Sequence, residues 1–146
     1  LTIRGGSDLG DARREARLHR ALGPARGGHL VDRYGSEVSV LLAMIDGDPA
    51  LAEPLSPELP YLGVEVVYAA RYEMATTLDD ILSRRTRARL RDIRATSAIA
   101  AKVAALVADD LEWDAARQAH EVETVRRSMN HELDAAALPH PFELVS

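Results

Sequence analysis

The sequence predicts an all-α fold, a bundle of about six helices with no sheet. Apolar residues recur at three- and four-residue steps in several segments, which is the spacing of one helix face. No segment alternates apolar and polar residues in the manner of a half-buried strand. The length of 146 residues suits one domain of ordinary size. These three observations together predict a single helical domain.

The first helices are expected in the N-terminal third of the chain. Residues 9–22 read as a short polar helix that Asp8 can cap, and the following stretch "GPARGG" predicts its end. Residues 29–45 show the clearest helical spacing, although Gly35 interrupts them at a cost of about 1 kcal/mol relative to alanine. Residues 46–60 contain four prolines, so we expect a loop there.

The segment 61–75 is apolar nearly all round, which predicts a buried helix. Its β-branched residues would also suit a strand, but Tyr68 and Tyr72, placed after Val64, favour the helix. Within this apolar helix Glu65 stands out, because a buried carboxylate requires partners. A tyrosine hydroxyl or an arginine could supply them, and we favour a structural hydrogen bond over a catalytic acid.

The second half of the chain predicts three more helices. Thr76 or Thr77 is expected to cap the first, whose opening turn contains Asp79 and Asp80, where negative charge suits the helix dipole. The others are expected at residues 97–110 and about 115–132, the latter capped by Asp114, with a loose tail at 138–146.

The composition narrows the function classes. The net charge of −5 argues against a general attraction to nucleic acid. The chain has no cysteine, which excludes disulfides and cysteine metal sites. The longest strongly apolar run, residues 38–45, is eight residues, whereas a membrane-spanning helix needs about 20.

An arginine run is the main candidate for binding. It comprises Arg84, Arg85, Arg87, Arg89, Arg91 and Arg94. On one continuous helix Arg84, Arg87, Arg91 and Arg94 would share a face, which could bind phosphate or a nucleic-acid backbone. The acidic stretch 109–123 offers the other interpretation, a charge match within the protein or between domains. We favour this match, since no aromatic residues separate the arginines as single-strand binding requires.

No catalytic or metal-binding motif is recognisable. The pairs His120–Glu121 and His131–Glu132 are eleven residues apart, about 16 Å along a helix, too far for one metal ion. The sequence "RYGSE" around Ser36 lacks the spacing of a nucleophile elbow. The stretch "GGSDLG" does not match a dinucleotide fingerprint. We therefore expect no catalytic, cofactor or metal residues in this chain.

Three sequence blocks nevertheless resemble a known family. They are "RYGSEVSVLLAMIDGDPALAEPL", "PYLGVEVVYAARYEMATTLDDILSRRTR" and, more loosely, "KVAALVADDLEWDAARQAHEVE". Together they resemble the C-terminal helical domain of the FAD-dependent, respiratory-type glycerol-3-phosphate dehydrogenases and the related α-glycerophosphate oxidases, over roughly residues 28 to 126. The middle block is the specific part. Its pattern carries over to Glu65, Arg71, Glu73, Thr77, Asp80, Arg84, Arg85, Thr86 and Arg87.

The resemblance implies a domain organisation. Residues 1–27 would comprise a linker from a preceding FAD domain, with "LTIRGG" as that domain's last strand, and the short polar helix. Residues 28–133 would form the helical C-terminal domain, and residues 134–146 a loose tail. The residues carried over from the pattern, from Glu65 to Arg87, would be structural or would dock the domain on the flavin domain.

The resemblance also implies a parent reaction. The parent would oxidise sn-glycerol 3-phosphate to dihydroxyacetone phosphate, with FAD taking the hydride and electrons passing to quinone, or to oxygen in the oxidase branch. FAD and substrate would be held by the N-terminal body, so this chain alone would be inactive. The parent would lie on the cytoplasmic side, peripherally associated with a membrane. The alternatives left open are an independent helical interaction or nucleic-acid-binding module, arginine contact with anionic lipid, and a homodimer.

Overall fold

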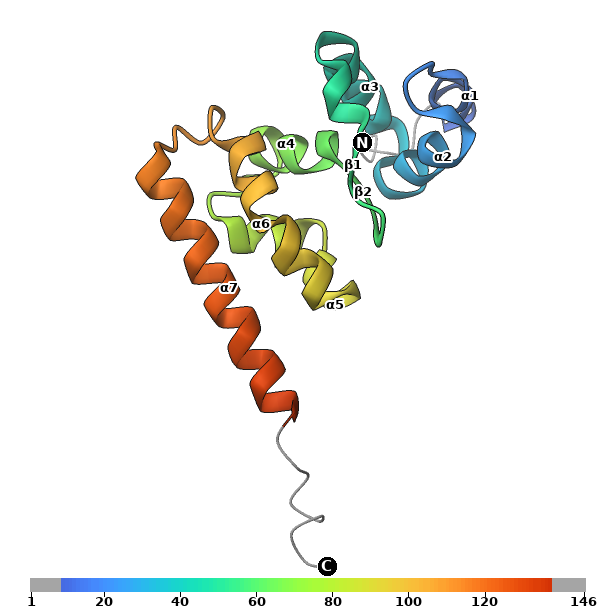
Figure 1. Cartoon of the computed structure of the whole chain (residues 1–146). Helices are drawn as coiled ribbons and strands as arrows, with labels where there is room; N and C mark the ends of the chain where they lie inside the picture. The colour runs from blue at the N-terminus through green and yellow to red at the C-terminus, as the bar shows by residue number, and fades with distance from the viewer. Residues whose placement is uncertain (1–8, 138–146) are drawn as a thin grey trace, which may run out of the picture.

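The structure, a computed structural model, describes residues 9–137 (Figure 1). Between these residues the chain forms seven α-helices and one β-hairpin. The helices are α1 (Leu9–Leu18), α2 (Gly23–Tyr34), α3 (Val38–Gly47), α4 (Gly63–Tyr72), α5 (Ala88–Arg91), α6 (Ile93–Val107) and α7 (Ala115–Ala137). Short 3-10 helices span Gly35–Glu37 (η1) and Pro49–Ala52 (η2), and a π-helix spans Asp80–Arg85 (η3). The expected linker strand, the Asp8 cap and the tail 138–146 lie outside the described residues.

The predicted absence of a sheet is wrong. Strands β1 (Pro54–Ser56) and β2 (Leu59–Leu62) pair antiparallel, with Pro54 opposite Leu62 and Ser56 opposite Leu59. They lie in the segment that its prolines marked as a loop. Two features allow the pairing: the register is irregular between Pro54 and Ser56, and proline is tolerated at edges and bulges. Strands of three and four residues are also too short to show an alternating pattern.

The single helix predicted over residues 29–45 is two helices. Gly35 adopts a φ of 57° and ends α2, and α3 begins at Val38 after the 3-10 turn. A positive φ is the conformation that glycine reaches more readily than other residues. Helix α2 also starts earlier than expected, inside "GPARGG", because Pro24 occupies the first turn, where its missing N–H needs no partner.

The arginine run does not form one helix, so the predicted common face of four arginines is wrong. The chain leaves η3 at Thr86, and Arg87 adopts a left-handed φ of 60°. Helix α5 then lasts only four residues. Asp92 starts α6 as its cap, accepting a hydrogen bond from the Ala95 amide at 2.9 Å. These breaks point successive arginines in different directions.

The core is aliphatic and lies between α3, α4, η3 and α6. Its largest fully buried side chains include Leu41, Leu42, Ile45, Leu78, Ile81 and Leu82.

Helix α7 lies along α6 at the opposite side of the molecule from α1 and α2 (Figure 1) and buries Val125 and Met129. The predicted cap of α7 is confirmed, since Asp114 accepts from the Arg117 amide at 2.7 Å. The helix continues to Ala137, five residues beyond the expected end. No helix within residues 9–137 is long and apolar enough to cross a membrane.

Candidate functional site

Glu65 is the centre of the most extensively bonded polar cluster in the described structure. Its side chain is completely buried in the first turn of α4. The carboxylate accepts a hydrogen bond from the Leu62 amide at 2.8 Å and from the Tyr34 hydroxyl at 3.3 Å. Arg33 Nε lies 3.0 Å from Oε1, and His29 Nε2 lies 3.1 Å from Oε2. The predicted burial of Glu65 and its predicted partners, a tyrosine hydroxyl and an arginine, are confirmed.

Helix α2 supplies three of these partners. His29 and Arg33 are four residues apart and therefore share a face, and Tyr34 is adjacent to Arg33. The fourth partner, the Leu62 amide, precedes α4, where unpaired N–H groups favour a negative side chain. Glu65 thus joins α2 to the junction of β2 and α4, elements more than 25 residues apart in sequence.

The groups around Glu65 complement its negative charge with hydrogen-bond donors and a guanidinium. Burial, followed by the Glu65 charge, raises the pKa of the Tyr34 hydroxyl far above its ordinary value, so this group donates. The Arg33 guanidinium also lies 5.0 Å from the Tyr61 ring centre, within cation–π range. A carboxylate offers about four acceptor positions. Four donors already surround Glu65, so the arrangement suits structural attachment of two helices.

Arg33 also connects this cluster to the end of the π-helix. Its Nη2 donates to the Arg85 carbonyl at 3.1 Å. Glu73 is half-buried nearby, and burial raises the pKa of its carboxyl even though Arg85 and Arg33 lower it. Three tyrosine rings continue the cluster outward: Tyr34 lies 5.3 Å from Tyr68, and Tyr68 lies 5.1 Å from Tyr72.

Thr77 and Asp80 cap the helical segment that leads into η3, as the sequence predicted. Thr77 Oγ1 accepts from the Asp80 amide, and the Asp80 carboxylate accepts from the amides of Thr76 and Thr77, each at 3.1 to 3.2 Å. This reciprocal pair confirms Thr77 as the cap. Burial raises the pKa of the Asp80 carboxyl, but the Thr76 and Thr77 hydrogen bonds outweigh burial and hold it below its ordinary value.

The arginines of the run have different environments. Arg84, Arg85 and Arg87 are all exposed, and within residues 9–137 none of them crosses to an acidic helix. Among the described residues, Arg84 pairs with Asp80, four residues earlier. Arg89 makes the crossing instead: it reaches Glu132 of α7 at 2.7 Å, Asp79 at 3.3 Å and Ser128 at 3.0 Å. The left-handed Arg87 redirects the chain so that Arg89, not its neighbours, faces α7.

Arg71 lies beside a groove on the surface of the domain. It pairs with Asp110, whose hydrogen bond at 2.6 Å raises the pKa of the Arg71 guanidinium. The groove, of about 660 Å³, lies between α3, α4 and α6. Its walls combine apolar side chains with the charged residues Asp48, Arg71, Asp109 and Asp110. Arg71 lies outside the arginine run, so its pair with Asp110 is not the match that the sequence predicted between that run and the acidic stretch 109–123.

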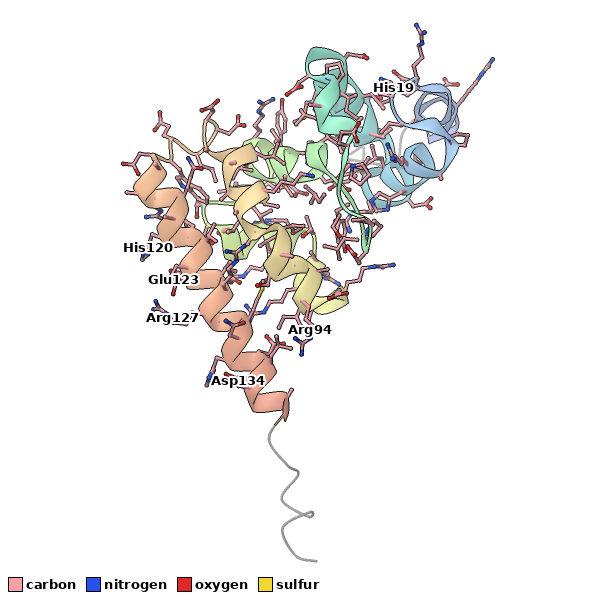
Figure 2. All side chains as sticks on the ribbon, in the orientation of Figure 1. His19, Arg94, His120, Glu123, Arg127 and Asp134 are labelled. Atoms are coloured by element: carbon pink, nitrogen blue, oxygen red, sulfur yellow. The ribbon has the colours of Figure 1, made fainter. Side chains whose placement is uncertain are left out.

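Within residues 9–137 no group of three or more histidine, aspartate or glutamate side chains is arranged to hold a metal ion. His120 projects from α7 on the side away from α6, as do Glu123 and Arg127 (Figure 2). The acidic neighbours of the two α7 histidines differ in burial: Glu121 is buried and accepts from the Leu78 amide at 2.9 Å, whereas Glu132 is exposed and binds Arg89.

Sequence reasoning missed four residues of these contacts: His29, Arg33, Tyr34 and, as the bridging arginine, Arg89. A signal was present for Tyr34, which belongs to the apolar stripe of Leu30 and Val38, whereas His29 and Arg33 lie one residue before that stripe. No comparable signal identified Arg89, since its orientation depends on the left-handed Arg87.

Comparisons with known proteins agree with the resemblance. Residues 1–118 match the family described as the C-terminal domain of alpha-glycerophosphate oxidase. "Glycerol-3-phosphate dehydrogenase 2" of Mycobacterium tuberculosis (strain ATCC 25618 / H37Rv) is 40% identical over 120 residues, which is 82% of this chain and 20% of that protein. "Glycerol-3-phosphate dehydrogenase" of Mycobacterium leprae (strain TN) is 37% identical over the same shares.

A more distant relative shows the same pattern. The protein named "Glycerol-3-phosphate dehydrogenase, mitochondrial" in Bos taurus is 30% identical over 109 residues, covering 72% of this chain and 15% of that protein. The chain thus spans about a fifth of the length of the mycobacterial relatives. No solved structure is significantly similar to it.

Proposed function

The chain belongs to the family of the C-terminal domain of alpha-glycerophosphate oxidase, and we propose on that basis that it is the accessory domain of an FAD-dependent glycerol-3-phosphate dehydrogenase. The observation that carries the proposal is the match itself. It covers most of this chain, but only about a fifth of the relatives that are named glycerol-3-phosphate dehydrogenases. The greater part of such an enzyme therefore corresponds to polypeptide other than these 146 residues.

The proposed reaction of the complete protein is the oxidation of sn-glycerol 3-phosphate to dihydroxyacetone phosphate. The secondary alcohol loses a hydride from carbon and a proton from oxygen. FAD supplies the hydride acceptor when bound in the body of the complete protein. Quinone is the proposed final electron acceptor. The complete enzyme would lie at the surface of a membrane, on its cytoplasmic side.

The described residues do not fit an FAD site. The dinucleotide-binding fold holds its ligand at the carboxyl edge of a parallel sheet, beside a glycine-rich turn. Between residues 9 and 137 the sheet is a two-stranded antiparallel hairpin whose residues pack into the helical core. We therefore assign FAD and substrate to the body and derive no chemical step from this chain.

The residues carried over from the family pattern suit a structural or docking role in this proposal. Glu65 attaches α2 to α4, Thr77 and Asp80 begin the next helix, and Arg71 pairs with Asp110. Arg84, Arg85 and Arg87 are exposed, which leaves them available to a neighbouring domain. The nucleic-acid alternative has no comparable support, because the arginines do not form one continuous basic face.

The test uses the complete protein encoded by the open reading frame that contains this sequence. Purified from its own host, it should contain flavin, visible in its absorption spectrum, and reduce an artificial dye when given sn-glycerol 3-phosphate. Reduction of a soluble quinone without hydrogen peroxide formation would support the dehydrogenase assignment. Stoichiometric hydrogen peroxide would identify an oxidase instead, and a flavin-free protein without dye reduction would refute the proposal.

A further inference from the structure

We propose that Tyr72, Glu73, Met74 and Arg85, here called the Met74 surface, form the place where the body of the complete dehydrogenase docks on this domain. The inference rests on the proposed function and names the part of the domain that contacts the body. The partner surface should be apolar opposite Met74 and Tyr72 and should present a carboxylate to Arg85.

The first observation is exposed apolar area. Among the described residues only three large hydrophobic side chains are widely exposed: Tyr72 at 58%, Met74 at 85% and Leu90 at 78%. Single exposed apolar residues are ordinary, but neighbouring ones rimmed by charge are typical of interaction sites. Tyr72 and Met74 form such a neighbouring pair, and Tyr72 also lines the 660 Å³ groove.

The backbone at Met74 is the second observation. Helix α4 ends with the amides of Glu73 and Ala75 both donating to the Ala69 carbonyl, and Met74 between them has a φ of 58°. This is the left-handed position after a helix, which glycine usually occupies because other residues are strained there. Met74 therefore strains the backbone while its exposed thioether gains little contact within the domain. A contact with another part of the protein would account for methionine at this position.

Ring packing and hydrogen bonds connect the Met74 surface to the buried Glu65 cluster. Tyr72 packs on Tyr68, which packs on Tyr34, and Tyr34 donates to the buried Glu65. The Arg85 carbonyl accepts from Arg33, which also binds Glu65. Surfaces held in one arrangement before binding lose less conformational freedom on association. The buried Glu65 cluster thus supports both the apolar and the basic part of the Met74 surface.

The charges favour a protein partner. Arg85 forms no ion pair within 4.0 Å with any residue in the described part of the chain, and Glu73 is half-buried beside it. Interfaces between domains of one chain combine apolar and polar groups in this manner. A lipid surface would instead favour a cluster of cations without a carboxylate among them. The body is the partner we choose, because the relatives contain about four-fifths of their length outside the match.

Methionine oxidation of the complete protein tests the proposal, since hydrogen peroxide converts accessible methionines to the sulfoxide. The sequence supplies internal references: Met44 and Met129 are buried in this domain, whereas Met74 is exposed. We expect Met74 in the complete protein to oxidise at least about tenfold more slowly than in the denatured protein, approaching Met44 and Met129. Oxidation of Met74 at the denatured rate would overturn the proposal.

Two other outcomes would also overturn it. Protection of Met74 that disappears when the complete protein is diluted to a monomer would identify a second copy as the partner. Protection that appears only with vesicles of anionic phospholipid would identify a membrane. A sample that binds flavin and oxidises sn-glycerol 3-phosphate, yet leaves Met74 unprotected, would refute the docking surface while leaving the proposed function standing.

A matched pair of variants locates the contact. Met74→Glu and Leu90→Glu each place a carboxylate at a widely exposed apolar position, so neither should unfold the domain. In the complete protein, Met74→Glu should accelerate amide hydrogen exchange across residues 73–87, whereas Leu90→Glu should leave that segment unchanged. Equal effects of both variants, or no effect of Met74→Glu, would contradict docking at the Met74 surface.

Discussion

Replacing Glu65 with glutamine is expected to destabilise the domain strongly. Glu65→Gln keeps the size of the side chain and one oxygen for the Leu62 amide, which lies 2.8 Å away. It removes the negative charge that Arg33 contacts at 3.0 Å and brings an NH₂ group among donors. The change therefore leaves a guanidinium in the protein without its partner.

The magnitude follows from the burial of the two groups. Loss of one partner of a fully buried pair costs roughly 3–5 kcal/mol. Glu65 is fully buried, but 28% of the Arg33 side chain is exposed, and water will solvate part of its charge. We therefore expect a loss of about 2–3 kcal/mol in unfolding free energy. For a chain of this size that lowers the melting temperature by roughly 5–10 °C.

Urea and thermal unfolding followed by circular dichroism measure this loss, with Glu37→Gln as the control. Glu37 is partly exposed and accepts one long hydrogen bond, from Tyr68 at 3.5 Å, so its loss should stay below about 1 kcal/mol. Equal losses in the two variants would refute the structural role of the Glu65 cluster. An unchanged melt for Glu65→Gln, with activity of the complete protein abolished, would indicate a catalytic carboxylate instead.

Three further predictions concern the segment after α4. Arg89→Ala should cost about 1–2 kcal/mol and Arg84→Ala less than about 0.5, in urea unfolding, because Arg89 bridges to α7 while Arg84 is largely exposed. The raised pKa of the Glu73 carboxyl means that stability falls as pH rises above the ordinary carboxyl value. Glu73→Gln should therefore be more stable than the parent at neutral pH, and a gain that persists below about pH 4 would contradict this. Met74→Gly should raise the unfolding free energy of this chain by about 0.5–1 kcal/mol by relieving the left-handed backbone, and a lower melting temperature would exclude such strain.

Local sequence signals predicted the elements that depend on local interactions. The Thr77 and Asp114 caps were predictable because the bonds that form them join residues three apart. The burial of Glu65 was predictable because the surrounding helix is apolar on every side. Its hydrogen-bonding partners could be named by type but not by number, since His29, Arg33 and Tyr34 lie 31 to 36 residues away.

The errors came from conformations that tertiary packing selects. The hairpin at residues 54–62 holds its short strands through Leu55, Leu59 and Tyr61, which are buried in the helical core. Helical spacing continues across Gly35, so the pattern alone did not reveal that its positive φ ends α2. Likewise, six closely spaced arginines suggested one helix, whereas the left-handed Arg87 separates η3 from α5.

The central proposal is that this chain belongs to a flavin dehydrogenase whose chemistry lies in the rest of the protein. The most direct measurement is the flavin content and substrate oxidation of the purified 146-residue chain, with the complete protein as the positive control. We expect a colourless, helical protein that releases no flavin on denaturation and reduces no dye with sn-glycerol 3-phosphate. Flavin bound at one equivalent, or dye reduction above the substrate-free rate, would contradict it.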